Sequence, residues 1–323
     1  MLSLFIVPLI ILSTGFITTP LALFAMYLTS GIGMAGVGMS VMHDANHGSY
    51  SKNKKVNELL GYTMNLIGAN AYVWKIQHNV LHHTYTNIED ADDDIATPFF
   101  LRFSPNDHKH WLNKYQHIYT WFFYGLSTIM WITVKDFINL NRFYNMGLVK
   151  ANITKENLKV AAWKMVYYVY ALLLPLIMIP LSPWLIVLAF LSMHFFTGLV
   201  ISTIFQTAHI MPNADYPLPD ENSEIENEWL VHQMATTTNY APKSKVLSWF
   251  IGGLNFQVEH HLLPNVCHVH YKELAPIVKQ TAEEYGIPYN YKATFLDAIV
   301  DHVKMLRYLG TAEPPEGLQK QTN

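Results

Sequence analysis

The sequence is poor in charge and in cysteine. Only 14% of its 323 residues are charged, whereas a soluble protein carries about 25%. The single cysteine, Cys267, excludes an internal disulfide and a thiolate metal cluster. The net charge of −3 and the lack of a basic stripe indicate no nucleic-acid partner. These shortages, with 51% hydrophobic residues, favour a protein embedded in a lipid bilayer.

Lysine and arginine are also absent from residues 1–51, and the first 42 residues are almost wholly apolar. Breaks in the apolar runs at Gly15 and at Pro180 to Pro183 predict the turns of two helical hairpins. The four predicted spans cover roughly residues 1–17, 21–42, 163–179 and 184–206. About 20 apolar residues cross a bilayer as a helix. We therefore expect an all-α protein, an integral membrane bundle of four spans forming one domain over residues 1–323.

The placement of basic residues predicts the orientation of this bundle. None of the 21 lysines and arginines lies in either hairpin turn. The positive-inside rule therefore assigns segments 43–162 and 207–323 to the cytoplasm. Spans two and four then end on the same face, which brings His43 and His209 into one compartment.

Residues 116–134 challenge this topology because they are long and apolar enough to form another span. If they crossed the bilayer, His209 would be separated from the other histidine groups. Their mixed tyrosine, tryptophan and threonine content favours an interfacial helix that lies in the membrane plane.

Half of the 16 histidines fall into groups just outside the predicted spans. These are His43 and His47; His78, His82 and His83; His209; and His260 and His261. Partners four residues apart share one helix face, whereas His83 lies about 100° further round. Imidazole is a common ligand of iron, copper and zinc, and eight ligands suit two ions. The pattern predicts a dimetal site at the membrane surface.

Three motifs, HDANH, HNVLHH and QVEHH, resemble the histidine boxes of the membrane fatty acid desaturase family. The similarity extends through GMSVMHDANHGSY, WKIQHNVLHHTYTN and GGLNFQVEHHLLP. A glutamine opening the third box is similar to front-end desaturases and their bacterial acyl-lipid or acyl-CoA relatives. The resemblance implies a four-span bundle under a cytoplasmic helical cap that holds two irons. It also implies that His209, in QTAHIMP, completes the ligand set.

The resemblance further implies an O₂-dependent reaction that inserts a cis double bond into a long-chain fatty acyl group. Strong C–H bonds require a metal–oxygen oxidant, while the protein supplies position and excludes water. The acyl carrier stays open between CoA, acyl carrier protein and phospholipid. The sequence has no His-Pro-Gly-Gly haem motif, so we expect electrons from a separate ferredoxin, or from a cytochrome with its reductase.

Several residues near the boxes are candidates for supporting roles. Gln257 is either a weak ligand or holds a metal-bound water, and Trp74 either walls an acyl tunnel or anchors at the interface. Metal-bound imidazoles usually donate their second N–H to a carboxylate or carbonyl. The predicted supporting residues are Asp44, Asn79, Asp90, Asp93 and His268. The acidic run from Glu89 to Asp94 could instead be a solvated loop or dock the electron donor.

The remaining histidines are expected to have ordinary structural roles. His194 lies within a predicted span, where a hydrogen bond inside the bundle is favoured over metal binding. Surface or interfacial positions are predicted for His108, His110, His117, His232 and His302.

Two alternative functions use the same residues. A hydroxylase on this scaffold would abstract one hydrogen and return oxygen to the carbon. A metal transporter or non-redox receptor would also need histidines, but transporters place ligands near mid-bilayer in broken helices. The predicted groups instead lie at and beyond the span tips, and the boxes favour desaturation.

Overall fold

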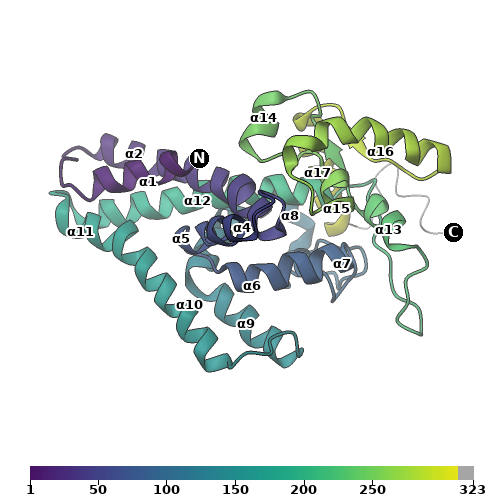
Figure 1. Ribbon diagram of the computed structural model, residues 1–323, viewed down its shortest axis with the longest axis horizontal. Helices are drawn as coiled ribbons and strands as arrows, with labels where there is room; N and C mark the ends of the chain where they lie inside the picture. Colours follow the sequence, from purple (N-terminus) through teal and green to yellow (C-terminus); the bar gives the residue numbers. More distant parts are fainter. Residues whose placement is uncertain (312–323) are drawn as a thin grey trace. The chain divides into compact units, whose positions relative to one another are not determined.

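The computed structural model describes residues 1–311, and the chain forms two compact units. Unit 1 comprises residues 1–76 and 122–202, and unit 2 comprises residues 77–121 and the chain from Thr203 onward. Helices α8 (Gln116–Met130) and α12 (Pro183–His209) and the π-helical segment η2 (Ile76–His82) contribute residues to both units. The units are described separately below (Figure 1).

All the regular secondary structure of unit 1 is helical. Its α-helices are α1 (Leu2–Leu12), α2 (Pro20–Gly36), α3 (Met42–His47), α4 (Lys54–Gly61), α5 (Thr63–Leu66), α6 (Ala71–Lys75), α9 (Asp136–Asn145), α10 (Ile153–Tyr168) and α11 (Leu174–Met178). Its π-helical segments are η1 (Val37–Val41), η4 (Trp131–Lys135) and η5 (Val169–Leu173).

Unit 2 is mainly helical. Its helices are α7 (His83–Tyr85), α13 (Trp229–Thr236), α14 (Lys245–Phe250), α15 (Gln257–Leu262), α16 (Tyr271–Tyr285) and α17 (Phe295–Gly310), with 3₁₀ turns η3 (Trp111–Tyr115) and η6 (His268–His270). Two two-residue strands, β1 (Asn239–Tyr240) and β2 (Tyr291–Lys292), pair in parallel. The expected all-α class is confirmed for the described part of the chain.

Three helices within residues 1–311 are long and apolar enough to cross a membrane: Pro20–His47, Ile153–Met178 and Pro183–His209. Helix α1 is also apolar but has only 11 residues. The helix Ile153–Met178 begins ten residues before the predicted span at 163–179, because Asn152 caps it by accepting a hydrogen bond from the Lys155 amide. Three of the four predicted spans therefore have matching helices, and the first remains a prediction.

Helices α1 and α2 pack side by side as the expected hairpin (Figure 1). Gly33 permits their close approach, because a Cβ there would lie 2.2 Å from the Phe5 amide nitrogen. The Ser30 hydroxyl also donates to the Phe5 carbonyl oxygen at 2.9 Å. Backbone contact, and not only side-chain packing, thus joins the two helices.

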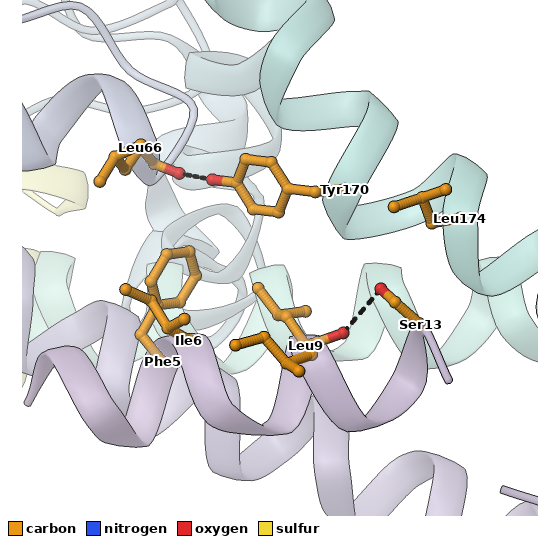
Figure 2. Close-up of a pocket in the computed structure, with 8 residues that line it drawn as sticks. Phe5, Ile6, Leu9, Ser13, Leu66, Tyr170 and Leu174 are labelled. Atoms are coloured by element: carbon orange, nitrogen blue, oxygen red, sulfur yellow. Dashed lines mark hydrogen bonds between the residues drawn. The ribbon is translucent and has the colours of Figure 1, made fainter. Parts of the chain in front are cut away.

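An apolar groove of about 360 Å³ opens between α1, η5 and α11 (Figure 2). Leu9 and Leu174 are among the residues that line it. Its polar side chains are turned to backbone: the Tyr170 hydroxyl donates to the Leu66 carbonyl, and the Ser13 hydroxyl donates to the Leu9 carbonyl at 2.8 Å. The surface of the groove is therefore almost entirely apolar.

Two groups of buried polar side chains in unit 1 form bonds within the protein. Lys164 forms a 2.7 Å ion pair with Asp136 and also donates to the Gly68 carbonyl at 3.2 Å. The Tyr167 hydroxyl lies 2.6 Å from His194 Nε2. The prediction that His194 forms a hydrogen bond inside the bundle is confirmed.

The segment that might have formed another span belongs to a helix running from Gln116 to Asn145 through α8, η4 and α9. It is not among the three membrane-crossing candidates found in residues 1–311. This agrees with the in-plane hypothesis, although the placement itself stays a prediction.

Candidate metal centre

Six of the eight candidate ligand histidines lie in unit 2, and their rings gather in its interior. All six are buried: His78, His82, His83, His209, His260 and His261. One ring nitrogen each from His82, His209 and His261 lies within 4.8 Å of the others. The same holds for His83, His260 and His261. Elements η2, α7, α12 and α15, remote in sequence, thus contribute imidazoles to one cluster.

The second box is carried by a π-helical turn. Hydrogen bonds in a π-helix run from residue i to i+5, so its turns are wider than α-helical ones. Residues five apart consequently approach one another, and His83 Nε2 lies 3.3 Å from His78 Nε2. The rings of His78 and His82 stack, with centroids 5.1 Å apart. The sequence predicted His83 about 100° further round an α-helix than His82. The wider π-turn instead brings its Nε2 next to that of His78.

Three of these imidazoles present buried nitrogens that the protein does not satisfy. Nε2 of His82, His209 and His261 has no hydrogen-bond partner among residues 1–311. A buried polar atom left without a partner costs about 1–3 kcal/mol, so three in one place call for a ligand. A metal cation suits three imidazole nitrogens that converge, and these residues therefore fit a metal ion.

The opposite nitrogen of each of the three rings is held by an acceptor. His82 Nδ1 donates to Asp92 Oδ1 at 2.9 Å, and His261 Nδ1 donates to Gln233 Oε1 at 2.8 Å. His209 Nδ1 lies 3.4 Å from the Thr236 carbonyl oxygen. Because oxygen acceptors require Nδ1 to carry the proton, the lone pair is left on Nε2.

The two best-defined ligands differ in electrostatic environment. Burial by itself lowers the pKa of His82, but the negative charges of Asp92 and Asp94 and the Asp92 hydrogen bond together raise it to about 9. Burial, followed by the charges of neighbouring histidines, lowers the pKa of His261 well below its ordinary value. His261 is thus a neutral base, whereas a cation must displace a proton from His82.

A buried carboxylate fixes the helix that carries the third box. Glu259 accepts hydrogen bonds from Asn239 Nδ2 at 2.8 Å and from the Tyr289 hydroxyl at 2.7 Å. Asn239 also accepts from the Val258 amide at 2.9 Å. Burial raises the pKa of Glu259, while these donors act in the opposite direction. Glu259 has a structural role: it connects α15 to β1 and to the loop that contains Tyr289.

Gln257, at the start of the third box, is also buried. Neither its amide oxygen nor its amide nitrogen has a hydrogen-bond partner within the described residues. Both remaining hypotheses for Gln257, a weak ligand or a residue that holds water, would satisfy these atoms.

The aspartates of the acidic run differ in burial and in contact with the second box. Asp92 and Asp94 approach the second box, with Asp94 Oδ2 3.3 Å from His78 Nδ1. Asp93 is buried and acts on His82 through its charge. Asp90 is exposed at a left-handed turn, with φ of 61°. Within the run, Asp92 and Asp94 contact histidines of the second box, and Asp93 acts through its charge.

Two other predicted supporting residues of unit 2 are less enclosed. Asn79 and His268 are both half-buried, His268 within η6. The third box instead contacts the η6–α16 junction through His260 Nδ1, which lies 3.2 Å from the buried Tyr271 hydroxyl.

The first box lies in unit 1, on α3. His43 and His47 are buried with ring centroids 4.8 Å apart. The Trp74 ring packs edge-on against both, at 5.6 Å and 5.8 Å. Asp44 Oδ1 lies 3.9 Å from His43 Nδ1. Gly48, with φ of 76°, ends the helix directly after the box.

Two histidines outside the boxes are not at the surface. His232 and His302 are buried, so their predicted surface positions are wrong. His302 Nδ1 donates to the Ile210 carbonyl at 2.9 Å. Each lies on the buried face of an amphipathic helix, His232 on α13 and His302 on α17.

Gln233, Thr236 and Tyr271 were missed by sequence reasoning. Their only signal is proximity to polar runs such as VHQMATTTNY, which resemble ordinary capping and loop segments. Hydrogen-bond acceptors need no fixed spacing from the ligand they orient, and so they form no motif.

Comparison with known proteins agrees with this geometry. A family profile described as fatty acid desaturase matches residues 18–293. The chain is 34% identical over 293 residues to sn-1 linoleoyl-lipid 6-desaturase of Arthrospira platensis, covering 90% of this chain and 79% of that protein. It is 34% identical over 284 residues to the protein of the same name in Synechocystis sp., covering 87% and 79%. It is also 34% identical over 294 residues to acyl-lipid (8-3)-desaturase of Physcomitrium patens, covering 90% and 60%.

The protein therefore belongs to the fatty acid desaturase family of enzymes. Its candidate membrane-crossing helices indicate a membrane protein, and its buried histidine clusters are those expected of a metal site in this family.

Proposed function

We propose that this enzyme inserts a cis double bond into a long-chain fatty acyl group, using O₂ and a di-iron centre. The observation that carries the proposal is the convergence of Nε2 atoms from His82, His209 and His261. These atoms lack protein partners within residues 1–311, while the opposite nitrogen of each ring is held by an acceptor. The family match supports fatty acyl desaturation as the chemistry of such a centre.

The proposed ligand set comprises His43, His47, His78, His82, His83, His209, His260 and His261, with Gln257 as a ninth candidate. The paired burial of His43 and His47 and the unpartnered amide of Gln257 support their inclusion. Trp74, which contacts the first box, is proposed to wall the acyl tunnel.

When bound, two irons would supply the oxidising power needed to remove hydrogens from neighbouring methylenes. The chain has three tasks around them. His82, His209 and His261 bind through Nε2, while Asp92, Gln233 and Thr236 hold the rings in the binding tautomer. Burial of the whole cluster excludes water, so the oxidant is directed at the substrate.

We further propose that the chain is one desaturase domain with four spans. Helix α1 would form a short first span with α2, because the Gly33 contact joins them as a hairpin. Segments 43–162 and 207–323 would then face the cytoplasm, as the distribution of basic residues indicates. The metal centre would lie on that face.

The substrate is proposed to be an acyl chain on a lipid, because two of the relatives carry linoleoyl-lipid desaturase names and a third an acyl-lipid name. Electrons would come from a protein donor, either a ferredoxin or a cytochrome with its reductase.

Expression in a host that lacks polyunsaturated lipids tests this function. Mass spectrometry should find a new double bond in lipid-linked acyl chains, and purified protein should contain two irons. His261→Ala should reduce the product to background while the protein stays in the membrane fraction, because one unpartnered Nε2 is lost.

The matched control is His108→Ala, which removes an exposed histidine and should leave product unchanged. A hydroxylated product would show that the enzyme is a hydroxylase and would contradict the proposed desaturation. Bound zinc without oxygen uptake would favour the receptor hypothesis.

A further inference from the structure

Gln233 lies in the fifth position of α13, and its side chain is fully buried. It belongs to none of the three histidine boxes. The hydroxyl of Thr237, just after the helix, donates to the backbone carbonyl oxygen of Gln233 at 2.6 Å and so anchors its backbone. The side chain lies in the interior of unit 2.

The amide oxygen of Gln233 contacts a histidine of the third box and a threonine that follows the second box. His261 Nδ1 donates to it at 2.8 Å, and the Thr86 hydroxyl lies 2.9 Å away. Thr86 follows the second box and also lies 2.7 Å from the His82 carbonyl oxygen. One oxygen atom therefore connects α15 with the segment that carries the second box.

The identity of this acceptor decides which nitrogen of His261 is available. An oxygen can only accept, so Nδ1 carries the proton and Nε2 keeps its lone pair. If the amide presented its NH₂ group instead, Nδ1 would be the acceptor and Nε2 would carry the proton. A protonated Nε2 cannot bind a metal.

The three converging ligands use three kinds of acceptor. His82 has the Asp92 carboxylate, His209 has a backbone carbonyl, and His261 has a neutral amide. A carboxylate makes an imidazole a stronger donor than an amide does. The three ligands therefore differ in the charge of their partners, and Gln233 supplies His261 with a neutral side-chain acceptor.

We propose that Gln233 is a positioning residue that sets the metal-binding tautomer of His261 and couples the second and third boxes. The inference rests on the proposed metal centre.

Two substitutions of similar shape separate this role from simple packing. Gln233→Leu removes the acceptor, and Gln233→Glu keeps an oxygen and adds negative charge. Metal-free protein would be titrated with Co²⁺, whose visible absorption bands report the ligands. Gln233→Leu should weaken Co²⁺ affinity about 10–100-fold, the usual effect of losing a partner of a metal-bound histidine. Gln233→Glu should restore binding and shift the bands.

Gln116→Leu is the matched control. Gln116 is also a fully buried glutamine of unit 2, and its amide bonds to Arg102 and Leu306 but to no box histidine. It should lose thermal stability while its folded fraction keeps wild-type affinity and bands. The proposal is overturned if Gln233→Leu binds Co²⁺ like the wild type, or if Gln116→Leu weakens binding equally.

If Gln233→Leu does not fold, Gln233→Glu still decides the matter, because bands identical to those of the wild type would contradict contact with a ligand. Wild-type protein that binds neither Co²⁺ nor iron would refute the metal centre itself. Normal wild-type binding with an indifferent Gln233→Leu would refute only this inference.

Discussion

The paired polar side chains inside unit 1 contrast with the histidine cluster of unit 2. In unit 1, Lys164 is paired with Asp136, and His194 with Tyr167. In unit 2, His82, His209 and His261 each contribute an Nε2 atom that has no partner in residues 1–311, and their ring nitrogens lie close together. Paired groups specify the packing of a bundle, whereas unpartnered ones that converge indicate a cation site.

The largest expected effect separates two histidines of one helix. His194 and His209 both lie on α12. His209→Ala should abolish product and metal loading while the protein remains folded, because it removes a ligand. His194→Ala should keep the metal but lose about 1–3 kcal/mol of stability, since the Tyr167 hydroxyl is left unsatisfied.

Iron content per chain and thermal unfolding in detergent would measure both effects. Loss of metal in His194→Ala but not in His209→Ala would reverse the assignment of structural and ligand roles.

A second prediction concerns the ion pair of unit 1. Asp136→Ala leaves the buried Lys164 ammonium without its counter-charge and should destabilise the protein by about 3–5 kcal/mol. Unfolding by denaturant would measure this loss, and iron per folded chain should not change. The more exposed pair of Lys159 and Glu156 is the control, because Glu156→Ala should produce no resolvable shift.

A smaller effect is expected from His302, a buried histidine outside the boxes. Burial lowers its pKa to about 4, although the hydrogen bond to Ile210 acts in the opposite direction. The unfolded chain, with a histidine pKa near 6.5, therefore binds more protons between these values. Stability should fall by about 3 kcal/mol as the pH is lowered from about 6.5 to about 4.

Unfolding measured across this pH range would test the prediction, with His302→Gln as the control. The glutamine can still donate to Ile210 but does not titrate, so the variant should lack this part of the pH dependence. Parallel curves for the two proteins would show that His302 is not protonated on unfolding.

The sequence predicted the helices better than their ends. Hydropathy identified the span near residues 21–42, but the helix continues through π-turn η1 to His47. A hydropathy pattern detects only the apolar part of a helix, and a cap such as Asn152 extends it into polar sequence. The histidines were identifiable because ligands at i and i+4 leave a readable pattern.

The residues that orient the ligands were not identifiable in the same way. Asp92 and Asp94, not Asp90, approach the second box because Asn87 and Asp90 adopt left-handed conformations that turn the loop. A run of four aspartates offers no sequence cue to which members face inward. Gln233 approaches His261 from 28 residues away in the chain, and nothing local marks it.

The π-helical winding of the segment that carries the second box is itself a condition for the cluster. Were this segment to relax to α-helical winding at the same length, His83 would lie about 140° round the helix axis from His78. The contact between their Nε2 atoms at 3.3 Å would then be lost. Substitutions far from any ligand could therefore weaken the site simply by favouring the narrower winding.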